Sequence, residues 1–367
     1  MDKYKTISAF NKWFSTIKFN QLPFSIREKI AQADKYHKKF RFEQFLKVFL
    51  YGIDGDRESL REIDTAFVSQ DLQQTMALEA ISHSQLSREL AQMDSEILWA
   101  IFAQLVEKSR AKAPATKRNA LYLVDSSTFS LNTTRYPWAE FRQTKAGVKL
   151  HLKLCFMDKN HFYPDQLEIT NAVEHDDNHL EVFVNQPEAT YIFDRGYIDY
   201  ERLDEREANG YFFVTRIKKN TKIHVRETYD TSQSKNVLSD QMVVLGSQVY
   251  LTSPFRLVTL QDKKGKFLRF VTNRFDVTAQ EVADMYKARW QIELFFKHIK
   301  QHMTVKTLFS REQGVTNQIL LAMIASLLTS LVKVATGSKK SPFQIKRLLK
   351  HLLFQPFEEW LALLTPT

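Results

Sequence analysis

The stretch Tyr286 to Lys300, YKARWQIELFFKHIK, is the part of the sequence around which the rest is arranged. Placed on an α-helix, its apolar side chains form one wall that we expect to face a core, made of Ala288, Ile292, Phe295, Phe296 and Ile299. One edge of that wall carries Tyr286, Arg289, Glu293 and Lys300. A row of one carboxylate, two cations and a phenol suits a site that holds a metal and a phosphate together. The alternative is a solvent-exposed stripe in which Arg289 and Glu293 form an ordinary helix-surface ion pair.

The composition of the chain bounds the class of protein. With 367 residues, of which 44% are hydrophobic and 26% charged, the chain fits a globular protein of two or three domains. The formal net charge of +10 favours a polyanionic partner, although charge alone does not identify nucleic acid. The single cysteine, Cys155, excludes an internal disulfide framework and a cysteine-based zinc site.

The sequence predicts neither a secretion signal nor a membrane span. Residues 1–14 lack the sustained apolar run of a signal peptide. The longest apolar run, Ile319 to Val332, is too short to span a bilayer and is expected to form a buried helix. We therefore expect a reducing, cytoplasmic setting.

Residues 1 to about 115 are expected to be helical, because apolar residues recur at helical spacing there. The segments 59–67 (SLREIDTAF) and 81–93 (ISHSQLSRELAQM) predict two short helices, the second capped by Ser82 or Ser84 and carrying Gln85 and Arg88. Such a pair is compatible with a helix-turn-helix that inserts its second helix into the major groove of DNA. An ordinary helical bundle is the alternative. The basic, Pro-containing stretch 109–119 is interpreted as a linker.

From residue 120 the pattern changes to alternating, β-rich sequence. Three strands are predicted within 120–170, then a helix near 177–185, a buried strand that ends before Asp194, a helix from about Asp199 and a strand at 211–219. This order indicates a mixed α/β domain. Residues from about 220 to 274 predict further strands, which we interpret as a β insertion. The tail from 333 to 357 has basic and no acidic residues, and is a candidate phosphate-contacting surface or an exposed terminal helix.

Three carboxylates stand out by their context. Asp125 ends the apolar run LYLV, Asp194 ends the run YIF, and Glu293 lies on the edge of the helical stretch described first. Singly, an Asp at a strand end is usually a turn or cap residue. Because strand ends of an α/β sheet converge on one edge, the two Asp are expected to meet there. Three carboxylates can hold two Mg²⁺ or Mn²⁺ ions, which act on the attacking and leaving oxygens of a phosphodiester.

The motifs DSST (125–128), FDRGYID (193–199) and Tyr-x2-Arg-x3-Glu-x6-Lys (286–300) resemble those of the DDE transposases of bacterial insertion sequences, in particular the IS-four family. The resemblance covers about residues 120–335, and the stretch 80–90 is less specifically similar to the N-terminal region of some relatives. It implies an α/β fold with an RNase H-like (retroviral-integrase-like) catalytic core, a β-strand insertion and a helical N-terminal domain before it. It also implies two Mg²⁺ or Mn²⁺ ions at Asp125, Asp194 and Glu293, which would be the catalytic residues.

The same resemblance implies cut-and-paste transposition through hairpin ends, acting on the terminal inverted repeats of the element and on target DNA. Tyr286, Arg289, Trp290 and Lys300 would contact DNA near the cut end, and Gln85 and Arg88 would contact it from the N-terminal domain. A homodimer in the DNA complex, association with the bacterial nucleoid and no membrane partner follow. One departure is that no Trp lies between 139 and 289, whereas some relatives grip a flipped base with a Trp of the β insertion.

Two rival sites contain histidine. His298 and His302 have the i,i+4 spacing of zinc ligands, but they project away from Glu293 on the helical wheel and have no evident third ligand. The segment HDDNH (175–179) combines several ligand types, yet acids in a first helical turn also favour the helix dipole. We interpret His298 and His302 as exposed helix residues in a position to touch DNA, and the HDDNH segment as structural, with a supporting role for His175 or Asp176 left open.

We predict a transposase with three domains: a helical DNA-binding domain at 1–115, a catalytic domain at 116–335 with its β insertion at about 220–274, and a basic helical tail at 336–367. Two alternatives remain at this point. One is a metal-dependent nuclease of the same fold, which would cut DNA without joining it. The other is a basic DNA-binding protein whose carboxylates are structural and which cleaves nothing.

Overall fold

The computed structural model describes residues 7–112, 120–134, 136–142, 145–173, 177–218, 220–232, 236–246, 253–262, 264–302 and 312–365. The chain forms two compact units. Unit 1 consists of Met1–Pro114, Phe129–Val148 and Phe296–Thr367, and unit 2 consists of Ala115–Thr128 and Lys149–Phe295. Segments far apart in the sequence therefore fold together in unit 1. The predicted division into three domains stays a prediction.

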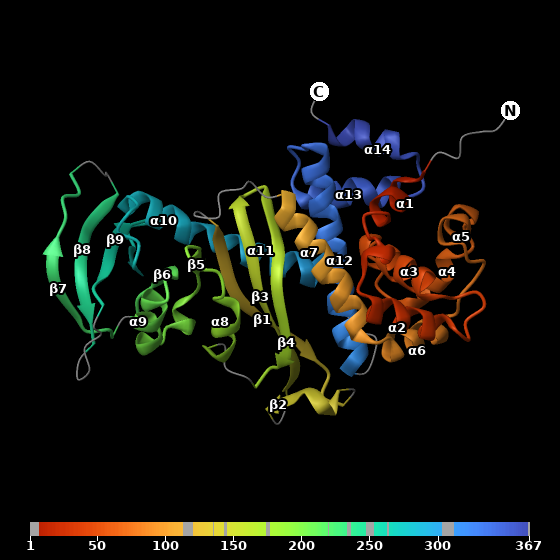
Figure 1. Ribbon diagram of the computed structural model, residues 1–367, viewed down its shortest axis with the longest axis horizontal. Helices are drawn as coiled ribbons and strands as arrows, with labels where there is room; N and C mark the ends of the chain where they lie inside the picture. The colour runs from red at the N-terminus through yellow and green to blue at the C-terminus, as the bar shows by residue number, and fades with distance from the viewer. Residues whose placement is uncertain are drawn as a thin grey trace. The chain divides into compact units, whose positions relative to one another are not determined.

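Unit 1 is mainly helical (Figure 1). Its N-terminal helices are α1 (Ala9–Phe14), α2 (Phe24–Asp34), α3 (Phe42–Asp54), α4 (Leu60–Ala66), α5 (Gln70–Met76), α6 (His83–Gln92) and α7 (Ser95–Lys112). Its C-terminal helices are α12 (Glu312–Thr336), α13 (Pro342–Leu352) and α14 (Phe357–Leu364). The helices predicted at 59–67 and 81–93 are present as α4 and α6. Helix α5 lies between them, so they are not joined by the single short turn of a simple helix-turn-helix.

Helix α12 is the centre of unit 1. It packs against α3, α6 and α7, and the predicted buried run, Ile319 to Val332, is buried over almost its whole length. The helix is 25 residues long, more than the apolar run alone predicted. In the described part of the chain it is the one helix long and apolar enough to cross a membrane, and 78% of its apolar window is buried. Burial in the core, rather than shortness, accounts for its composition.

The basic tail is partly used inside unit 1. Lys346 and Lys350 of α13 donate to the two carboxylate oxygens of Asp56, at 2.8 and 3.0 Å. Lys346 is itself buried. These two lysines therefore hold α13 against the end of α3, which leaves less of the tail for the phosphate-contacting role that its composition predicted.

Unit 2 is built on a large mixed sheet. Its strands run in the order β3-β1-β5-β6-β10-β9-β8-β7, with β4 on β3. The short β2 (Glu140–Arg142) belongs to unit 1, as does the start of β3 with which it pairs. The bounds are β1 (Leu121–Leu131), β3 (Lys145–Asp158), β4 (His161–Asn171), β5 (Thr190–Ile192), β6 (Phe212–Arg216), β7 (Ile223–Thr228), β8 (Val237–Leu245), β9 (Phe255–Gln261) and β10 (Phe267–Thr272). The helices α8 (Asp177–Phe183) and α9 (Tyr200–Ala208) occur where the sequence predicted them.

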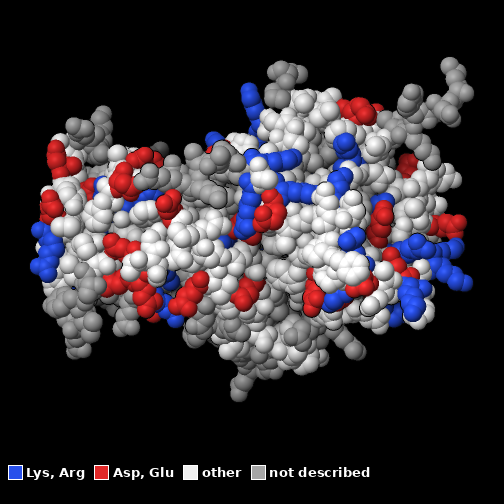
Figure 2. All heavy atoms as spheres, viewed as in Figure 1, with Lys and Arg blue, Asp and Glu red and all other residues white. Residues whose placement is uncertain are grey.

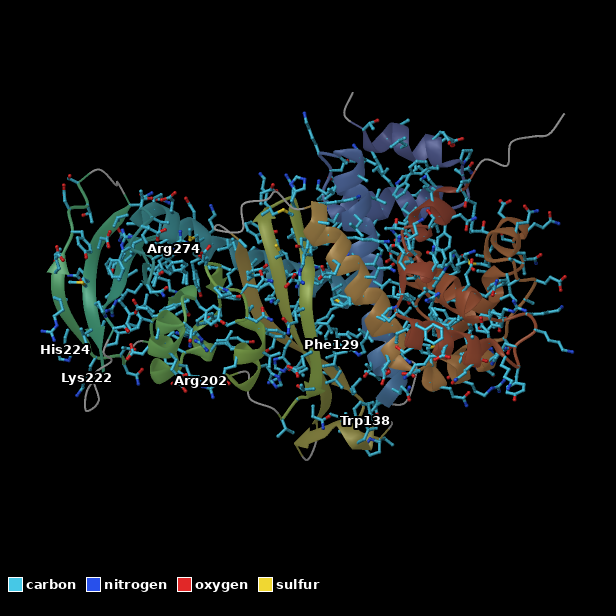
Figure 3. All side chains as sticks on the ribbon, viewed as in Figure 1. Phe129, Trp138, Arg202, Lys222, His224 and Arg274 are labelled. Atoms are coloured by element: carbon cyan, nitrogen blue, oxygen red, sulfur yellow. The ribbon has the colours of Figure 1, made fainter. Side chains whose placement is uncertain are left out.

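The β insertion continues the main sheet. β10 pairs antiparallel with β6, so β7 to β10 add four strands to the strands that carry the candidate site. Arg274 (labelled in Figure 3) joins the two parts, because its guanidinium donates to Thr190 Oγ1 of β5 at 2.6 Å. At the far edge, β7 is exposed along most of its length, with Lys222 directly before the strand and His224 as its second residue (both labelled in Figure 3).

The stretch Tyr286 to Lys300 spans two helices rather than one. α10 (Ala279–Ala288) begins with a capping box, in which Thr278 Oγ1 accepts the N–H of Glu281 and the Glu281 carboxylate accepts the N–H of Thr278. At Arg289 the backbone N–H bonds to the carbonyl of Tyr286, three residues back instead of four. α11 (Trp290–His302) then follows. The predicted apolar wall is confirmed, since Ala288, Ile292, Phe295, Phe296 and Ile299 are all buried.

Candidate active site

Three parallel strands bring polar residues to one row. Leu123 of β1 lies opposite Ile192 of β5, which lies opposite Val214 of β6, and all three are fully buried. Two residues further along each strand direction stand Asp125, Asp194 and Arg216. Because residues two apart share a face of a strand, the parallel register places two carboxylates and a guanidinium side by side at the carboxyl ends of the strands.

The junction of α10 and α11 adds three more groups to this row. Arg289 Nη1 lies 3.6 Å from Asp125 Oδ2, and Arg289 Nη2 donates to Glu293 Oε1 at 2.5 Å. Tyr286 donates its hydroxyl to Asp194 Oδ1 at 3.3 Å. The helix junction is therefore tied to both strand-end carboxylates, and Arg289 bridges Asp125 and Glu293. The pairing of Arg289 with Glu293 is more than the surface ion pair that the sequence alone allowed.

The electrostatics of the row centre on Asp125. Burial raises the pKa of its carboxyl to about 6, and the negative charges of Glu293 and Asp194 act in the same direction. The Ser126 backbone N–H, 2.8 Å from Oδ1, and the Arg289 guanidinium oppose this rise in pKa. The three acids are thus close enough to repel one another, and a cation among them is stabilising.

The donor set fits a divalent metal, although the side chains are not arranged around one. In the described residues, no group of three His, Cys, Asp or Glu side chains converges closely enough to hold an ion. The Arg289 guanidinium occupies the space next to Asp125 and Glu293 and supplies the positive charge there. Carboxylate oxygens are ligands preferred by Mg²⁺ and Mn²⁺, so a hard divalent cation could take over the role that Arg289 has in this structure.

Tyr286 and Trp290, on either side of Arg289 in the sequence, differ in burial: Tyr286 is buried and Trp290 is exposed. Tyr286 stacks on Phe270 of β10, with ring centroids 4.8 Å apart, and burial raises the pKa of its phenol to about 12. It remains a hydrogen-bond donor at neutral pH. Trp290 is 57% exposed, a large fraction for a residue of this size. The prediction that Trp290 lies outside the core is confirmed.

The remaining predicted DNA contacts lie in unit 1. Lys300 packs its ammonium over the ring of Phe129, 5.1 Å from the centroid (Phe129 is labelled in Figure 3), and burial lowers the pKa of Lys300. Gln85 and Arg88 lie on α6, Gln85 half-buried and Arg88 exposed. Ser82, one of the two predicted caps, is the residue that caps this helix.

Arg216 is a site residue that sequence reasoning missed. It ends β6 at the same register position that Asp194 holds after β5, and its positive charge opposes the rise in the pKa of Tyr286. A signal was present in the strand pattern YFFVTR, where a cation follows a buried strand just as an acid follows YIF. The register was needed to connect the two strand ends.

The rival histidine sites are not supported as metal centres. His298 stacks on Phe343 of α13, with ring centroids 4.0 Å apart, and the side chain of His302 lies outside the described residues. His175 and Asp176 also lie outside them. His179 Nδ1 forms a hydrogen bond with Glu168 Oε2 at 2.6 Å, and its ring stacks on His151. These contacts are consistent with the structural interpretation of this segment.

Comparison with known proteins identifies the family. The sequence pattern of the Transposase DDE domain matches residues 117–328, more than half of the chain. The chain belongs to the DDE transposase family. It is 30% identical over 308 residues to the probable transposase for insertion sequence element IS5377 of Geobacillus stearothermophilus, covering 82% of this chain and 79% of that protein. It is 27% identical to the putative transposase for insertion sequence element IS4SA of Synechocystis sp., over 64% of this chain and 66% of that protein.

A solved structure supports the fold. The piggyBac transposase, in a synaptic complex with hairpin DNA, aligns with 98% of this DDE transposase and 82% of its own chain, with a TM-score of 0.51 and 12% identity. At that identity the likeness concerns the fold alone. The IS-four-type resemblance of the sequence is confirmed, and the chain is a transposase that acts on DNA. DDE transposase domains in general cleave and transfer DNA and depend on divalent metal ions.

Proposed function

We propose that this DDE transposase cuts and joins DNA at the ends of an insertion sequence, with Asp125, Asp194 and Glu293 as its catalytic residues in an RNase H-like core. The observation that carries the proposal is the row at the strand ends, in which Asp125 and Asp194 follow strands in parallel register. Arg289 bridges Asp125 to Glu293, and Asp194 accepts the hydroxyl of Tyr286. The fold class, the three-domain division and a homodimer on nucleoid DNA belong to the same proposal.

The three carboxylates would hold two Mg²⁺ or Mn²⁺ ions, which when bound supply activation of the attacking oxygen and stabilisation of the leaving oxygen. The raised pKa of Asp125 supports this, because a buried carboxyl beside two other acids is short of positive charge. The remaining chemistry is positioning by the chain's own side chains. Arg289 pairs with Asp125 and Glu293 in this structure, and with another cation on those carboxylates its fork of donors would suit a phosphate near the cut end.

The groups around the carboxylates suit a bent DNA terminus. Tyr286 keeps its proton and can donate it to a phosphate oxygen, while Arg216 and Arg289 neutralise crowded phosphates. The exposed ring of Trp290 can stack on an unstacked base. Bending costs a few kcal/mol per unstacked step, so such contacts must offset it. We therefore propose hairpin closure of each cut end, followed by reopening and joining to target DNA. Lys300 would contact phosphate, and Gln85 and Arg88 would contact DNA from α6.

Joining separates this function from that of a nuclease. A labelled DNA carrying one element end, incubated with the full chain, Mg²⁺ and a circular target, should yield target molecules that carry the label. Replacing Asp125, Asp194 or Glu293 by Ala should abolish that product while DNA affinity stays within a few-fold, since binding depends on distributed basic contacts. Glu205→Ala, which removes an exposed carboxylate of α9, is the matched control and should join normally. Cleavage without any joined product would identify a nuclease instead.

A further inference from the structure

A shallow basin of about 500 Å³ lies between α4 and α6 of unit 1. Arg61 and the start of α4 line it together with four residues of α6, which are His83, Ser84, Ser87 and Arg88. Both guanidinium groups are on exposed residues. In the described part of the chain, neither arginine has an ion-pair partner. The basin therefore presents two available cations and several hydroxyl donors to one volume.

The acidic side chains of α4 near the basin accept hydrogen bonds from neighbouring residues. No acidic residue lines it among the described residues. Asp64 Oδ2 accepts both the backbone N–H and the ring Nδ1 of His83, each at 3.0 Å, and the side-chain hydrogen bond lowers the pKa of Asp64. Glu62 accepts the backbone N–H of Glu58 at 3.0 Å. An anion in the basin would meet net positive charge.

The basin is also preformed, because α6 is fixed at both ends. At its start, Ser82 Oγ accepts the N–H of Gln85 at 3.2 Å. At its end, two amide side chains of α12 donate to carbonyls of the last turn. Asn317 Nδ2, fully buried, donates to Leu90 O at 2.9 Å and to Met93 O at 2.8 Å, and Gln313 Nε2 donates to Met93 O at 2.8 Å.

We propose that this basin binds a phosphate group of the DNA backbone, held between Arg61 and Arg88, and so sets the position of α6 on the duplex. Charge complementarity supports a phosphate, because arginines from two helices line the same basin and a guanidinium can donate two parallel N–H groups to phosphate oxygens. Backbone contacts of this kind fix the register of a protein on DNA without reading sequence. On the view in Figure 2, Lys and Arg are visible at the right, interspersed with Asp and Glu, over the part of unit 1 where Figure 1 shows α2, α4 and α6. The inference rests on the proposed function in taking α6 as a DNA-contacting helix, and it adds Arg61.

The salt dependence of DNA binding tests the proposal. The affinity of the full chain for a random-sequence duplex and for a duplex carrying an element end would be measured by fluorescence anisotropy over a range of KCl concentrations. Losing one phosphate contact lowers the slope of log affinity against log salt by about 1. We expect Arg61→Gln to show this smaller slope and to weaken both duplexes by the same factor, on the order of tenfold at low salt. Arg61→Lys should restore most of the slope, because it keeps the charge.

The matched control is Arg110→Gln, which removes an exposed arginine of α7 that pairs with Glu107 at 2.7 Å. It should leave the slope and both affinities unchanged. An unchanged slope in Arg61→Gln, or a loss of affinity for the element end only, would overturn the proposal. Thermal unfolding of each variant checks that the fold is intact, and among the described residues Arg61 has no ion-pair partner whose loss should lower the midpoint. If wild type joins DNA while Arg61→Gln binds DNA like wild type, the phosphate-binding proposal for the basin is refuted and the proposed transposase function is not.

Discussion

Replacing Asp125 by Asn should stabilise the metal-free protein at neutral pH. Burial and the two neighbouring acids raise the pKa of Asp125 from 3.8 to about 6, so the ionised carboxylate is less favourable in the folded chain than in the unfolded one. Asn has nearly the same shape and never ionises. The catalytic carboxylate of Asp125 would thus lower the unfolding free energy of the protein until a cation binds.

The magnitude follows from the pKa change. A rise from 3.8 to about 6 corresponds to about 3 kcal/mol of unfolding free energy, which is the upper limit of the gain. The folded chain binds the Asp125 proton more tightly, so wild type loses stability as pH rises from about 4 to about 6. The variant lacks this loss. The difference between the two should be small at pH 4 and complete above pH 7.

Urea unfolding of both proteins in EDTA, at pH values between 4 and 8, measures the effect. Adding Mg²⁺ should then stabilise wild type and leave Asp125→Asn nearly unchanged, because a ligand stabilises only the state that binds it. Asp199→Asn, another half-buried acid of unit 2, serves as the control. Equal stabilities in EDTA at pH 7.5, or a variant less stable than wild type there, would refute the electrostatic reasoning.

Other predictions concern single contacts. Trp290→Ala should still nick the first strand but slow hairpin formation, since the exposed ring is proposed to hold an unstacked base. A time course on an end-labelled terminus resolves nicked, hairpin and released DNA. Equal slowing of both steps would show that Trp290 acts in general DNA binding. His298→Ala should keep metal-dependent cleavage and lose about 1 kcal/mol of stability with its packing on Phe343; a loss of cleavage restored by added zinc would show that the metal site had been misplaced. Asn317→Leu should lower the unfolding free energy by about 1–3 kcal/mol, because the Leu90 carbonyl loses its side-chain donor while the Met93 carbonyl retains the one from Gln313; an unchanged urea midpoint would contradict this.

The periodic features of the chain were predictable from the sequence. Alternating and continuous apolar runs gave β1, β3, β4, β5 and β6, because burial on a sheet leaves a direct mark on composition. The same reasoning found the wall of α11 that includes Ile292 and Phe295, and the exposed position of Trp290. Asp125 and Asp194 were found because each acid interrupts a buried run, which is a local signal.

Features that depend on contacts between distant residues were not predictable. The strand-end rule predicted that Asp125 and Asp194 share one sheet edge, but the place of Arg216 beside them depends on the parallel pairing of β6 with β5, and register leaves no mark in one strand alone. The ion pair between Arg289 and Asp125 joins residues 164 positions apart. The break between α10 and α11 at Arg289 was also not predicted, because a helical wheel assumes one continuous helix. Lys346 was predicted to lie in a phosphate-contacting surface or an exposed helix, because nothing in the local sequence indicates its ion pair with Asp56.

Single-turnover cleavage of an end-labelled element terminus tests the central claim most directly. Wild type in Mg²⁺ should cut at the element end, and EDTA should abolish cutting. Asp125→Asn, Asp194→Asn and Glu293→Gln should each bind the terminus within a few-fold of wild type and cut none of it, while Glu205→Gln cuts normally. Near-wild-type cleavage by any one of the three variants, or cleavage by wild type in EDTA, would contradict the account.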